Sequence, residues 1–249
     1  MALVVVGGQA RKVGKTSIVA GLISAIGERR WTAIKTSGHI HQDSRDAAST
    51  LIASGRGFVL TEETSARLRA GYGRRSALRL PPQRQRENRR WGPRLPPQRA
   101  EPRWGPRLAA RVQTGDTDTA RFVGAGAERV YWLQAEEDCL GEAIPHLRKI
   151  ISAASDVDVI IESTGIVQWL TPDLYLLALD FGVEEFKPSA RRSLHQVDAF
   201  LLHRDREEPL WQGISPQTLP ARPMLSMRPP RYITPEIVEF VRRRLGHKS

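Results

Sequence analysis

Short, fully apolar runs alternate with segments of helical periodicity along most of the chain. The first run, Leu-Val-Val-Val at 3–6, is typical of a central strand that is buried on both faces. Apolar residues then recur at helical spacing over 15–26. Further predicted strands are 31–35, 129–133, 157–161, 174–179 and 199–202, and further predicted helices are 44–53, 118–124, 140–154, 188–194 and 235–245. Thr234 followed by Pro235 is a good N-cap and first-turn pair for the last helix.

This alternation predicts an α/β fold of three layers, with five to seven mostly parallel strands covered by helices on both faces. A length of 249 residues suits a single domain over 1–249 and is short for two. No apolar run approaches the ~18–20 residues that a membrane-spanning helix needs, and the first residues lack the pattern of a signal peptide. The lone Cys139 suits a reducing compartment, so we expect a cytoplasmic protein with no membrane partner.

One segment departs from this pattern in its composition. Fourteen arginines and two glutamates give residues 67–111 a net charge of +12, against +11 for the whole chain, so the remainder carries −1. The sequence RLPPQR occurs at 79–84 and 94–99, and RWGPRL at 90–95 and 103–108. Prolines and mutually repelling arginines sustain neither a helix nor an interior strand. We therefore predict a disordered, low-complexity Arg/Pro-rich insertion over 70–112.

The same segment has a second interpretation, as a nucleic-acid-binding arm. Trp91 and Trp104 would stack on bases while the arginines contact phosphates. Because the positive charge belongs to this one segment, the rest of the chain gives no reason to expect a nucleic-acid partner.

The strongest chemical signal lies between the first strand and the first helix. The sequence GGQARKVGKTS at 7–17 combines a glycine-rich turn with Gly14-Lys15-Thr16, and such loops direct backbone amides and a helix N-terminus at a polyphosphate. Lys15 would reach the outer phosphates, and the Thr16 hydroxyl would ligate Mg²⁺. The usual pattern has glycine where this chain has Gln9. The predicted nucleotide-binding residues here are Gly8, Gln9, Ala10, Arg11, Lys12, Val13, Gly14, Lys15, Thr16 and Ser17.

A magnesium–nucleotide site also needs a carboxylate at the end of a neighbouring strand. Glu162 ends the apolar run that begins near Asp158, so it would face the water shell of the metal at the edge where open sheets bind ligands. We therefore predict Thr16 and Glu162 as metal-site residues, and Lys15 and Glu162 as catalytic residues. Asp158 is better interpreted as a strand-entry residue.

Several motifs resemble the GTP-binding accessory proteins of molybdopterin-guanine dinucleotide biosynthesis, the MobB-type family of P-loop NTPases. That family has a strand ending in Ile-Lys before a histidine-rich turn, and here Lys35 precedes His39 and His41. Its motif Asp-Thr-x-Arg-x-x-x-Ala-Gly-Ala matches 118–127 at every position, and its acidic strand end Val-Glu-Gly corresponds to Ile-Glu-Ser at 161–163. The resemblance covers roughly 2–60 and 113–170. The histidine spacing and the serine at 163 depart from the family.

The resemblance implies a protein that binds GTP with Mg²⁺ and hydrolyses it slowly, acts as a homodimer, and has a partner in molybdenum-cofactor biosynthesis. It places Asp118 and Arg121 at the nucleotide, and these two residues, three apart on a predicted helix, share a face. There they would either position a switch element or form a local ion pair.

Other features leave the base and the reaction open. The phosphate loop is also similar to that of dethiobiotin synthetase, which predicts an ATP-dependent ligase or kinase with a second pocket near Lys35, His39 and Thr164. The Asn-Lys-x-Asp run that reads guanine is missing; Asp205, after the strand at 199–202, is its nearest substitute. Both GTP and ATP therefore remain candidates. His39 and His41, next to Asp43, are candidate metal or phosphate contacts.

Overall fold

The computed structural model describes residues 1–38, 49–55, 57–63 and 117–246, and their strands form one nine-stranded sheet. The strands are β1 Leu3–Gly8, β2 Trp31–Ser37, β3 Ser49–Gly55, β4 Phe58–Glu63, β5 Arg129–Ala135, β6 Asp158–Glu162, β7 Leu174–Asp180, β8 Ala199–His203 and β9 Met224–Ser226. Their order is β3-β4-β5-β2-β6-β1-β7-β8-β9. The seven strands from β5 to β9 in this order are parallel, which confirms the predicted parallel sheet.

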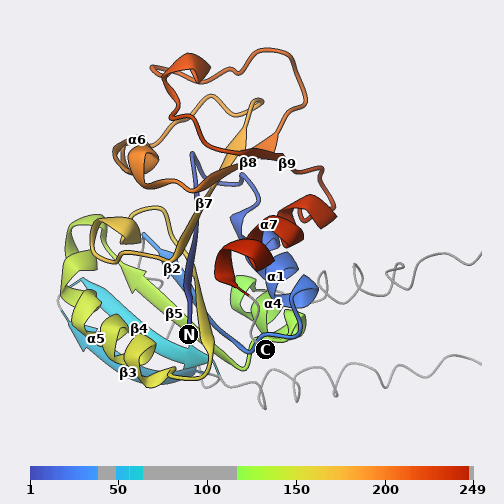
Figure 1. Ribbon diagram of the computed structural model, residues 1–249. Coiled ribbons are helices and arrows are strands. Elements are labelled where there is room, and N and C mark those ends of the chain that lie inside the picture. The colour runs from blue at the N-terminus through green and yellow to red at the C-terminus, as the bar shows by residue number, and fades with distance from the viewer. Residues whose placement is uncertain (39–48, 56, 64–116, 247–249) are drawn as a thin grey trace, which may run out of the picture.

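Helices cover both faces of the sheet, as predicted (Figure 1). The α-helices are α1 Lys15–Ala25, α4 Asp118–Ala125, α5 Leu140–Ala153, α6 Pro188–Ser193 and α7 Pro235–Leu245, and the short 3-10 helices are η2 Glu137–Cys139, η3 Ile166–Gln168, η4 Leu194–Gln196 and η5 Pro216–Thr218. Helices α1, α4 and α7 pack on one face, and α5, η3 and α6 pack on the other. The result is the three-layer α/β arrangement that the sequence indicates.

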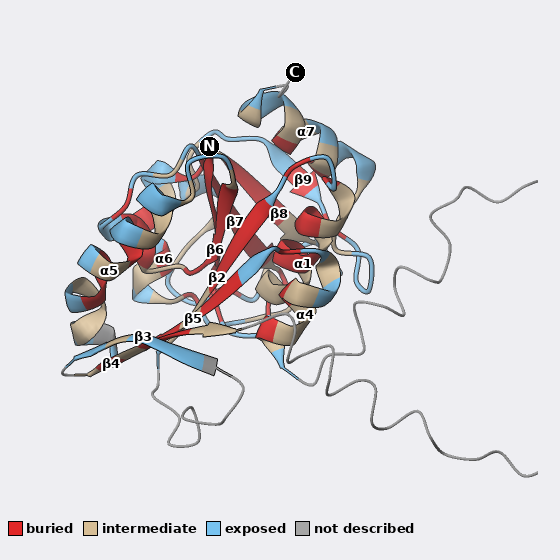
Figure 2. Ribbon diagram, turned by 90° about the horizontal axis from the view of Figure 1, so that it is seen from below, coloured by how far each residue is buried: buried red, intermediate tan, exposed pale blue. Residues whose placement is uncertain are grey.

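Side chains alternate along the central strands between these two layers. Val4 and Val6 of β1 join the cluster under α1, whereas Leu3 and Val5 join the cluster under α5. Successive strand residues point to opposite faces of the sheet. A strand that is covered by helices on both faces therefore has apolar residues at every position. Figure 2 shows the central strands buried and stretches of β3 at the sheet edge exposed.

The predicted helix over 44–53 is wrong where the structure describes it. Residues 49–55 are β3, which pairs antiparallel with β4, and β4 pairs antiparallel with β5. Gly57 closes the hairpin with φ +70°, and a Cβ there would lie 2.4 Å from Cys139 Sγ. Leu51 and Ile52 are adjacent apolar residues and both are exposed on this edge strand, so the sequence shows no alternation of apolar and polar residues that would predict a strand here. Residues 44–48 and the predicted insertion at 70–112 lie outside the described residues.

A buried ion pair ties the start of the sheet to the C-terminal helix. Arg29 Nη1 lies 2.7 Å from Asp158 Oδ2, with side-chain exposures of 4% and 0%. Asp158 Oδ1 also accepts a hydrogen bond from Ala2 N, and Arg29 Nη2 donates to O of Leu245, the last residue of α7. Asp158 is thus the structural strand-entry residue that its position predicts. Within the described residues, no helix has the length and apolarity needed to cross a membrane.

Candidate functional site

The loop between β1 and α1 turns sharply through two residues with left-handed backbone conformations. Gly14 caps α1 with φ 87°, and a Cβ there would lie 2.1 Å from the Tyr232 ring, so only glycine fits. Lys12 has a φ of 61°, which is a strained conformation for a residue with a side chain. This strand–loop–helix unit at a parallel sheet is the arrangement that the phosphate-loop motif predicts.

A cleft of about 1630 Å³ opens in front of this loop. Its walls come from the carboxyl ends of β2, β5 and β6 and from the segments after β1, β6 and β7, which is the edge where open α/β sheets bind ligands. The predicted residues that line it are Arg11, Lys12, Gly14, Lys15, Thr16, Ser17, Asp118, Arg121 and Glu162. The predicted residues that do not line it are Gly8, Gln9, Ala10 and Val13.

Lys15 is folded back onto its own loop. Its Nζ donates a hydrogen bond of 2.8 Å to Ala10 O. Burial, together with the neighbouring ammonium groups of Lys187 and Lys35, lowers the pKa of Lys15 from 10.5 to about 8, against the opposing effect of Glu162. An anion in the cleft would favour the charged form of Lys15, so a bound polyphosphate and the Lys15 ammonium would stabilise each other.

Glu162 is held at the end of β6 by two side chains that face the cleft. Its Oε2 accepts a hydrogen bond from Thr16 Oγ1 at 2.9 Å, and its Oε1 accepts one from Lys35 Nζ at 3.0 Å. The Glu162 side chain is only 5% exposed, so these partners offset the cost of burying its charge. The predicted pair Thr16 and Glu162 is therefore in direct contact.

Asp118 and Arg121 lie at the start of α4, and each has a partner on another element. Lys35 Nζ is 2.7 Å from Asp118 Oδ2, so one ammonium bridges Asp118 and Glu162. Arg121 Nη2 donates to Ser17 Oγ at 2.8 Å, whereas its Nη1 lies 4.0 Å from Asp118 Oδ1. The predicted shared face is present, and the stronger contacts run to α1 and β2.

The donor set fits a magnesium ion that is completed by phosphate and water. The Thr16 hydroxyl and the Glu162 carboxylate are hard oxygen ligands of the kind that Mg²⁺ prefers, and Mg²⁺ usually takes only one or two such groups from the protein. Among the described residues, no group of three or more His, Cys, Asp and Glu could hold a metal ion by itself.

Gln9 points away from the cleft and is fully buried. Its backbone amide donates to Ala178 O, and its side chain bonds the loop after β7. The Gly8 amide donates to Thr164 Oγ1 at 3.0 Å, and Thr164 Oγ1 donates to Gly8 O at 3.1 Å. These two amides therefore anchor the loop to neighbouring segments of the protein.

Sequence reasoning missed much of the cleft lining, including Lys187, Tyr232, Trp132 and Trp169. Lys187 and Tyr232 come from segments far beyond the motif, and no local pattern singles them out. His39, His41 and Asp43 lie outside the described residues. Asp205 does not line the cleft; it lies 3.7 Å from Arg206 Nε, with 43% of its side chain exposed.

Comparisons with known families, curated proteins and solved structures give one match, to a solved structure. No model of a known family matches it, and no curated protein does. Among solved structures, the "apo" form of LpxK from Aquifex aeolicus in complex with ATP matches with a TM-score of 0.40 and 13% identity. The match covers 92% of this chain and 54% of the LpxK chain, so this chain spans about half of that length. At this TM-score, the likeness decides neither fold nor function.

Proposed function

We propose that the cleft binds a nucleoside triphosphate with Mg²⁺ and that the chain hydrolyses it slowly. The observation that carries this proposal is the meeting of Lys15, Thr16 and Glu162 in one cleft at the N-terminus of α1. A helix N-terminus and a nearby ammonium favour a polyphosphate, and the hydroxyl–carboxylate pair favours a hard cation. A glycine turn that arose by chance and binds no nucleotide would have no need of the Glu162 carboxylate next to Thr16.

In this proposal the basic residues hold the phosphates. Lys15 would exchange its hydrogen bond to Ala10 O for one to an outer phosphate oxygen, where its positive charge stabilises the negative charge of the transition state. Lys187 and Arg192 line the same cleft and extend the positive potential beyond the loop. Arg11 and Lys12 are exposed at the tip of the loop and would face the phosphates or a second protomer.

Thr16 and Glu162 would hold the magnesium ion, which would offset the negative charge of the phosphates when it is bound. Glu162 would also accept a hydrogen bond from a water molecule and keep it oriented. Lys35 contacts both Glu162 and Asp118 and offsets part of their negative charge, so these two carboxylates repel the incoming phosphates less.

The finer assignments follow from the sequence resemblance. We propose GTP as the nucleotide, with ATP as the alternative, because the match at 118–127 is to a GTP-binding family. The same resemblance supports a cytoplasmic homodimer that serves molybdenum-cofactor biosynthesis with a partner protein.

We propose that the insertion at 70–112 is dispensable for nucleotide binding. The alternative is that it binds nucleic acid, and this alternative would be supported if deletion of 74–111 abolished salt-dependent nucleic-acid binding.

The test is a calorimetric titration with GTP and with ATP, each with and without Mg²⁺. We expect the affinity of Lys15→Ala for its nucleotide to fall by at least tenfold relative to the wild type. Lys149→Ala, on the exposed side of α5, is the matched control and should bind like the wild type. Equal, weak binding of both nucleotides by the wild type and Lys15→Ala would show that the loop holds no nucleotide.

The second candidate is the ATP-dependent ligase or kinase. It is favoured by the extent of the cleft, which continues past Lys35 along β5 to Trp132 and Ala135. Nucleoside diphosphate release that depends strictly on an added metabolite would support it, whereas basal hydrolysis that is insensitive to such additions would support the simple NTPase.

A further inference from the structure

The cleft has room for more than a nucleotide. Typical small-molecule pockets measure roughly 300–1,000 Å³, whereas this cleft measures about 1630 Å³. From the phosphate loop it extends in two directions along the sheet order. One end lies toward β7 and includes Lys187 and Arg192, and the other lies toward β5. We call the second part the tryptophan end; it consists of Trp132, Ala135, Asp138, Leu140, Gln168 and Trp169.

The tryptophan end is chemically unlike the phosphate loop. Its six residues include one carboxylate, Asp138, and no Lys or Arg. The end toward β7 has Lys187 and Arg192 against one carboxylate, Glu185, and the adjoining phosphate loop adds Arg11 and Lys12. A polyanion would therefore extend toward the basic residues and leave the tryptophan end free. The group that fits the tryptophan end is uncharged and presents an apolar surface to an indole ring.

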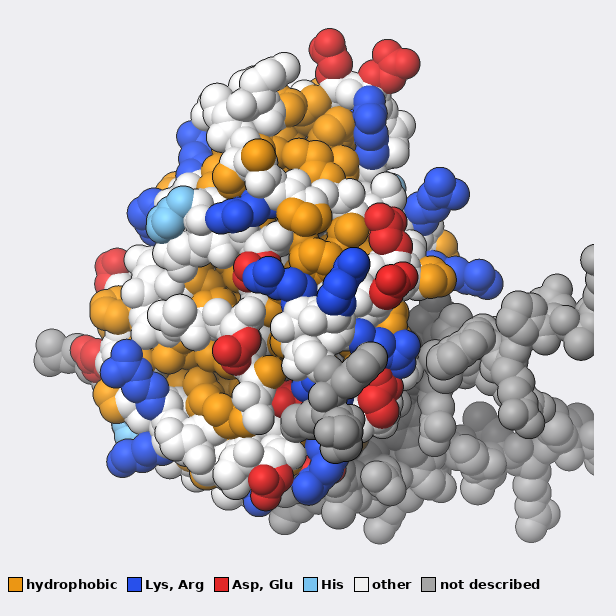
Figure 3. All heavy atoms as spheres, in the orientation of Figure 1, with side chains coloured by type: hydrophobic (Ala, Val, Ile, Leu, Met, Phe, Trp, Pro, Cys, Tyr) orange, Lys and Arg blue, Asp and Glu red, His pale blue; other side chains and the backbone are white. Residues whose placement is uncertain are grey.

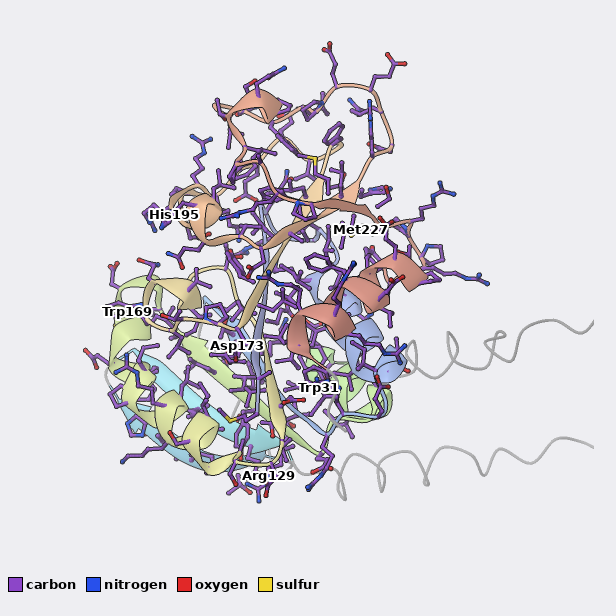
Figure 4. All side chains as sticks on the ribbon, viewed as in Figure 1. Trp31, Arg129, Trp169, Asp173, His195 and Met227 are labelled. Carbon is purple, nitrogen blue, oxygen red and sulfur yellow. The ribbon has the colours of Figure 1, made fainter. Side chains whose placement is uncertain are left out.

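Trp169 is exposed although its position is fixed. It is 47% exposed and is the only aromatic among the exposed large hydrophobic residues that the structure describes. Its backbone N donates to Ile166 O at 2.9 Å, and its backbone O accepts from Arg148 Nη2 at 3.1 Å. A Cβ on Gly141 would lie 3.0 Å from its ring, so the glycine makes room for it. Figure 4 shows Trp169 far from Trp31, which is buried on the side of α1 and α4.

Trp132 connects this end to the reacting centre. Its Nε1 donates to Ser37 Oγ at 3.1 Å, which satisfies the polar edge of the ring. A smaller hollow of about 280 Å³ is lined by Trp132 together with Lys35 and Asp118. A ring packed on Trp132 would therefore lie next to Asp118, which is the more exposed of the two carboxylates that contact Lys35, at 43% against 5%.

We propose that the tryptophan end binds a neutral small molecule with a flat aromatic ring and a hydroxyl group, and that this hydroxyl accepts the terminal phosphoryl group. The inference rests on the proposed nucleoside triphosphate site, which supplies the phosphoryl donor. The hydroxyl oxygen attacks the terminal phosphorus, and the new O–P bond forms as the bond to the bridging oxygen breaks. The electron pair leaves with the nucleoside diphosphate, and the hydroxyl proton passes to the Asp118 carboxylate. Without an acceptor, water takes the place of the hydroxyl.

The test uses 2-naphthylmethanol as the probe and glycerol as a hydroxyl-bearing compound without a ring. Saturation-transfer NMR is recorded with the full chain, Mg²⁺ and a non-hydrolysable nucleotide. We expect saturation of naphthylmethanol but not of glycerol, because offset stacking on an indole adds favourable energy that a polyol lacks. Trp169→Ala should reduce the saturation at least fivefold, and Trp169→Phe should retain most of it. Leu210→Ala, an exposed apolar residue that does not line the cleft, is the control and should behave like the wild type.

The outcomes separate the two proposals. Nucleotide affinity is measured by calorimetry on the same proteins, and phosphoryl transfer by ³¹P NMR as growth of a phosphate monoester signal with hydrolysable nucleotide. If the wild type binds no nucleotide, the proposed function fails. If it binds nucleotide but naphthylmethanol gives no Trp169-dependent saturation, only the acceptor site fails. If the probe binds and no monoester forms, the transfer step is overturned.

Discussion

The side-chain oxygen of Gln9 accepts a hydrogen bond of 2.8 Å from the backbone amide of Asp180 at the end of β7. Its side-chain nitrogen donates to Val183 O at 2.9 Å, and its backbone O accepts from Lys187 N at 2.8 Å. The residue that departs from the usual glycine pattern thus ties the phosphate loop to the segment that carries Lys187. A glycine at position 9 could not make the side-chain bonds.

Gln9→Ala should lower the free energy of unfolding, because it leaves buried backbone groups without partners. A single unsatisfied buried group costs about 1–3 kcal/mol, so we expect a loss at the upper part of that range in urea denaturation. Gln196→Ala, at an exposed position in η4, is the matched control and should unfold like the wild type. Equal stability of the two variants would contradict the structural role of Gln9.

Anion affinity should fall as the pH rises through the pKa of Lys15. Burial lowers this pKa to about 8, whereas the value in the unfolded chain is 10.5. The terminal phosphate has a pKa of about 6, so it stays ionised above pH 8, and the loss of affinity then reports Lys15. One pH unit above its pKa, a group keeps roughly a tenth of its protons, and the affinity for Mg²⁺-free nucleotide at pH 9 should fall several-fold relative to pH 7.

Lys15→Gln provides the control for that titration. Its affinity should be low and nearly independent of pH between 7 and 9, and the same pH profile as the wild type would assign the titration to another group.

The effect of Lys15 on the free energy of unfolding changes with pH in the direction opposite to its effect on anion affinity. The folded state penalises the charged form of Lys15, and this penalty is fully present below about pH 8 and is relieved as the pH rises toward 10.5. The free energy of unfolding should therefore gain a positive contribution from Lys15 over that interval.

Glu162→Gln should remove most of the magnesium dependence of nucleotide binding. The amide keeps the size of the side chain but has no charge for the cation, and it leaves Lys35 with Asp118 alone. We expect the ratio of nucleotide affinities with and without Mg²⁺ to approach one, while affinity without Mg²⁺ stays the same or increases because a negative charge has gone. Glu136→Gln, an exposed residue outside the cleft lining, should keep the ratio of the wild type. An unchanged ratio in Glu162→Gln would exclude this residue from the metal site.

The sequence predicted the central strands of the sheet and the helices that have clear periodicity or caps. β1 and β6 are short runs with both faces covered, and α7 begins at a good N-cap, where Thr234 Oγ1 accepts from Ile237 N. The hairpin β3–β4 was missed because its pairing depends on a partner, β5, that lies more than sixty residues along the chain. The exposed Leu51 and Ile52 give this strand no alternating pattern to recognise.

In the candidate site too, residues with a local sequence signature were predictable and residues that depend on distant contacts were not. Thr16 and Glu162 were predictable because a loop motif and a strand end each have a local signature, and parallel strands bring their carboxyl ends to one edge. The bridging role of Lys35 was not predictable, because it depends on the distances to two carboxylates on other elements. On the face seen in Figure 3, basic and acidic side chains are interspersed, in keeping with a net charge of −1 for the chain outside 67–111.

Arg29→Met should destabilise the protein strongly, because it leaves the Asp158 carboxylate buried without its ion-pair partner. Removing one member of a buried pair costs roughly 3–5 kcal/mol, and the loss should appear as a lower midpoint in urea denaturation. Arg30→Met is the matched control: the neighbouring Arg30 pairs with Glu128 on the surface, at side-chain exposures of 61% and 40%, so its removal should change the midpoint little. Adding Asp158→Asn to Arg29→Met removes the stranded charge and should restore part of the stability. If the double variant is less stable than Arg29→Met, the cost comes from the lost hydrogen bonds to Ala2 N and Leu245 O and not from the unpaired charge.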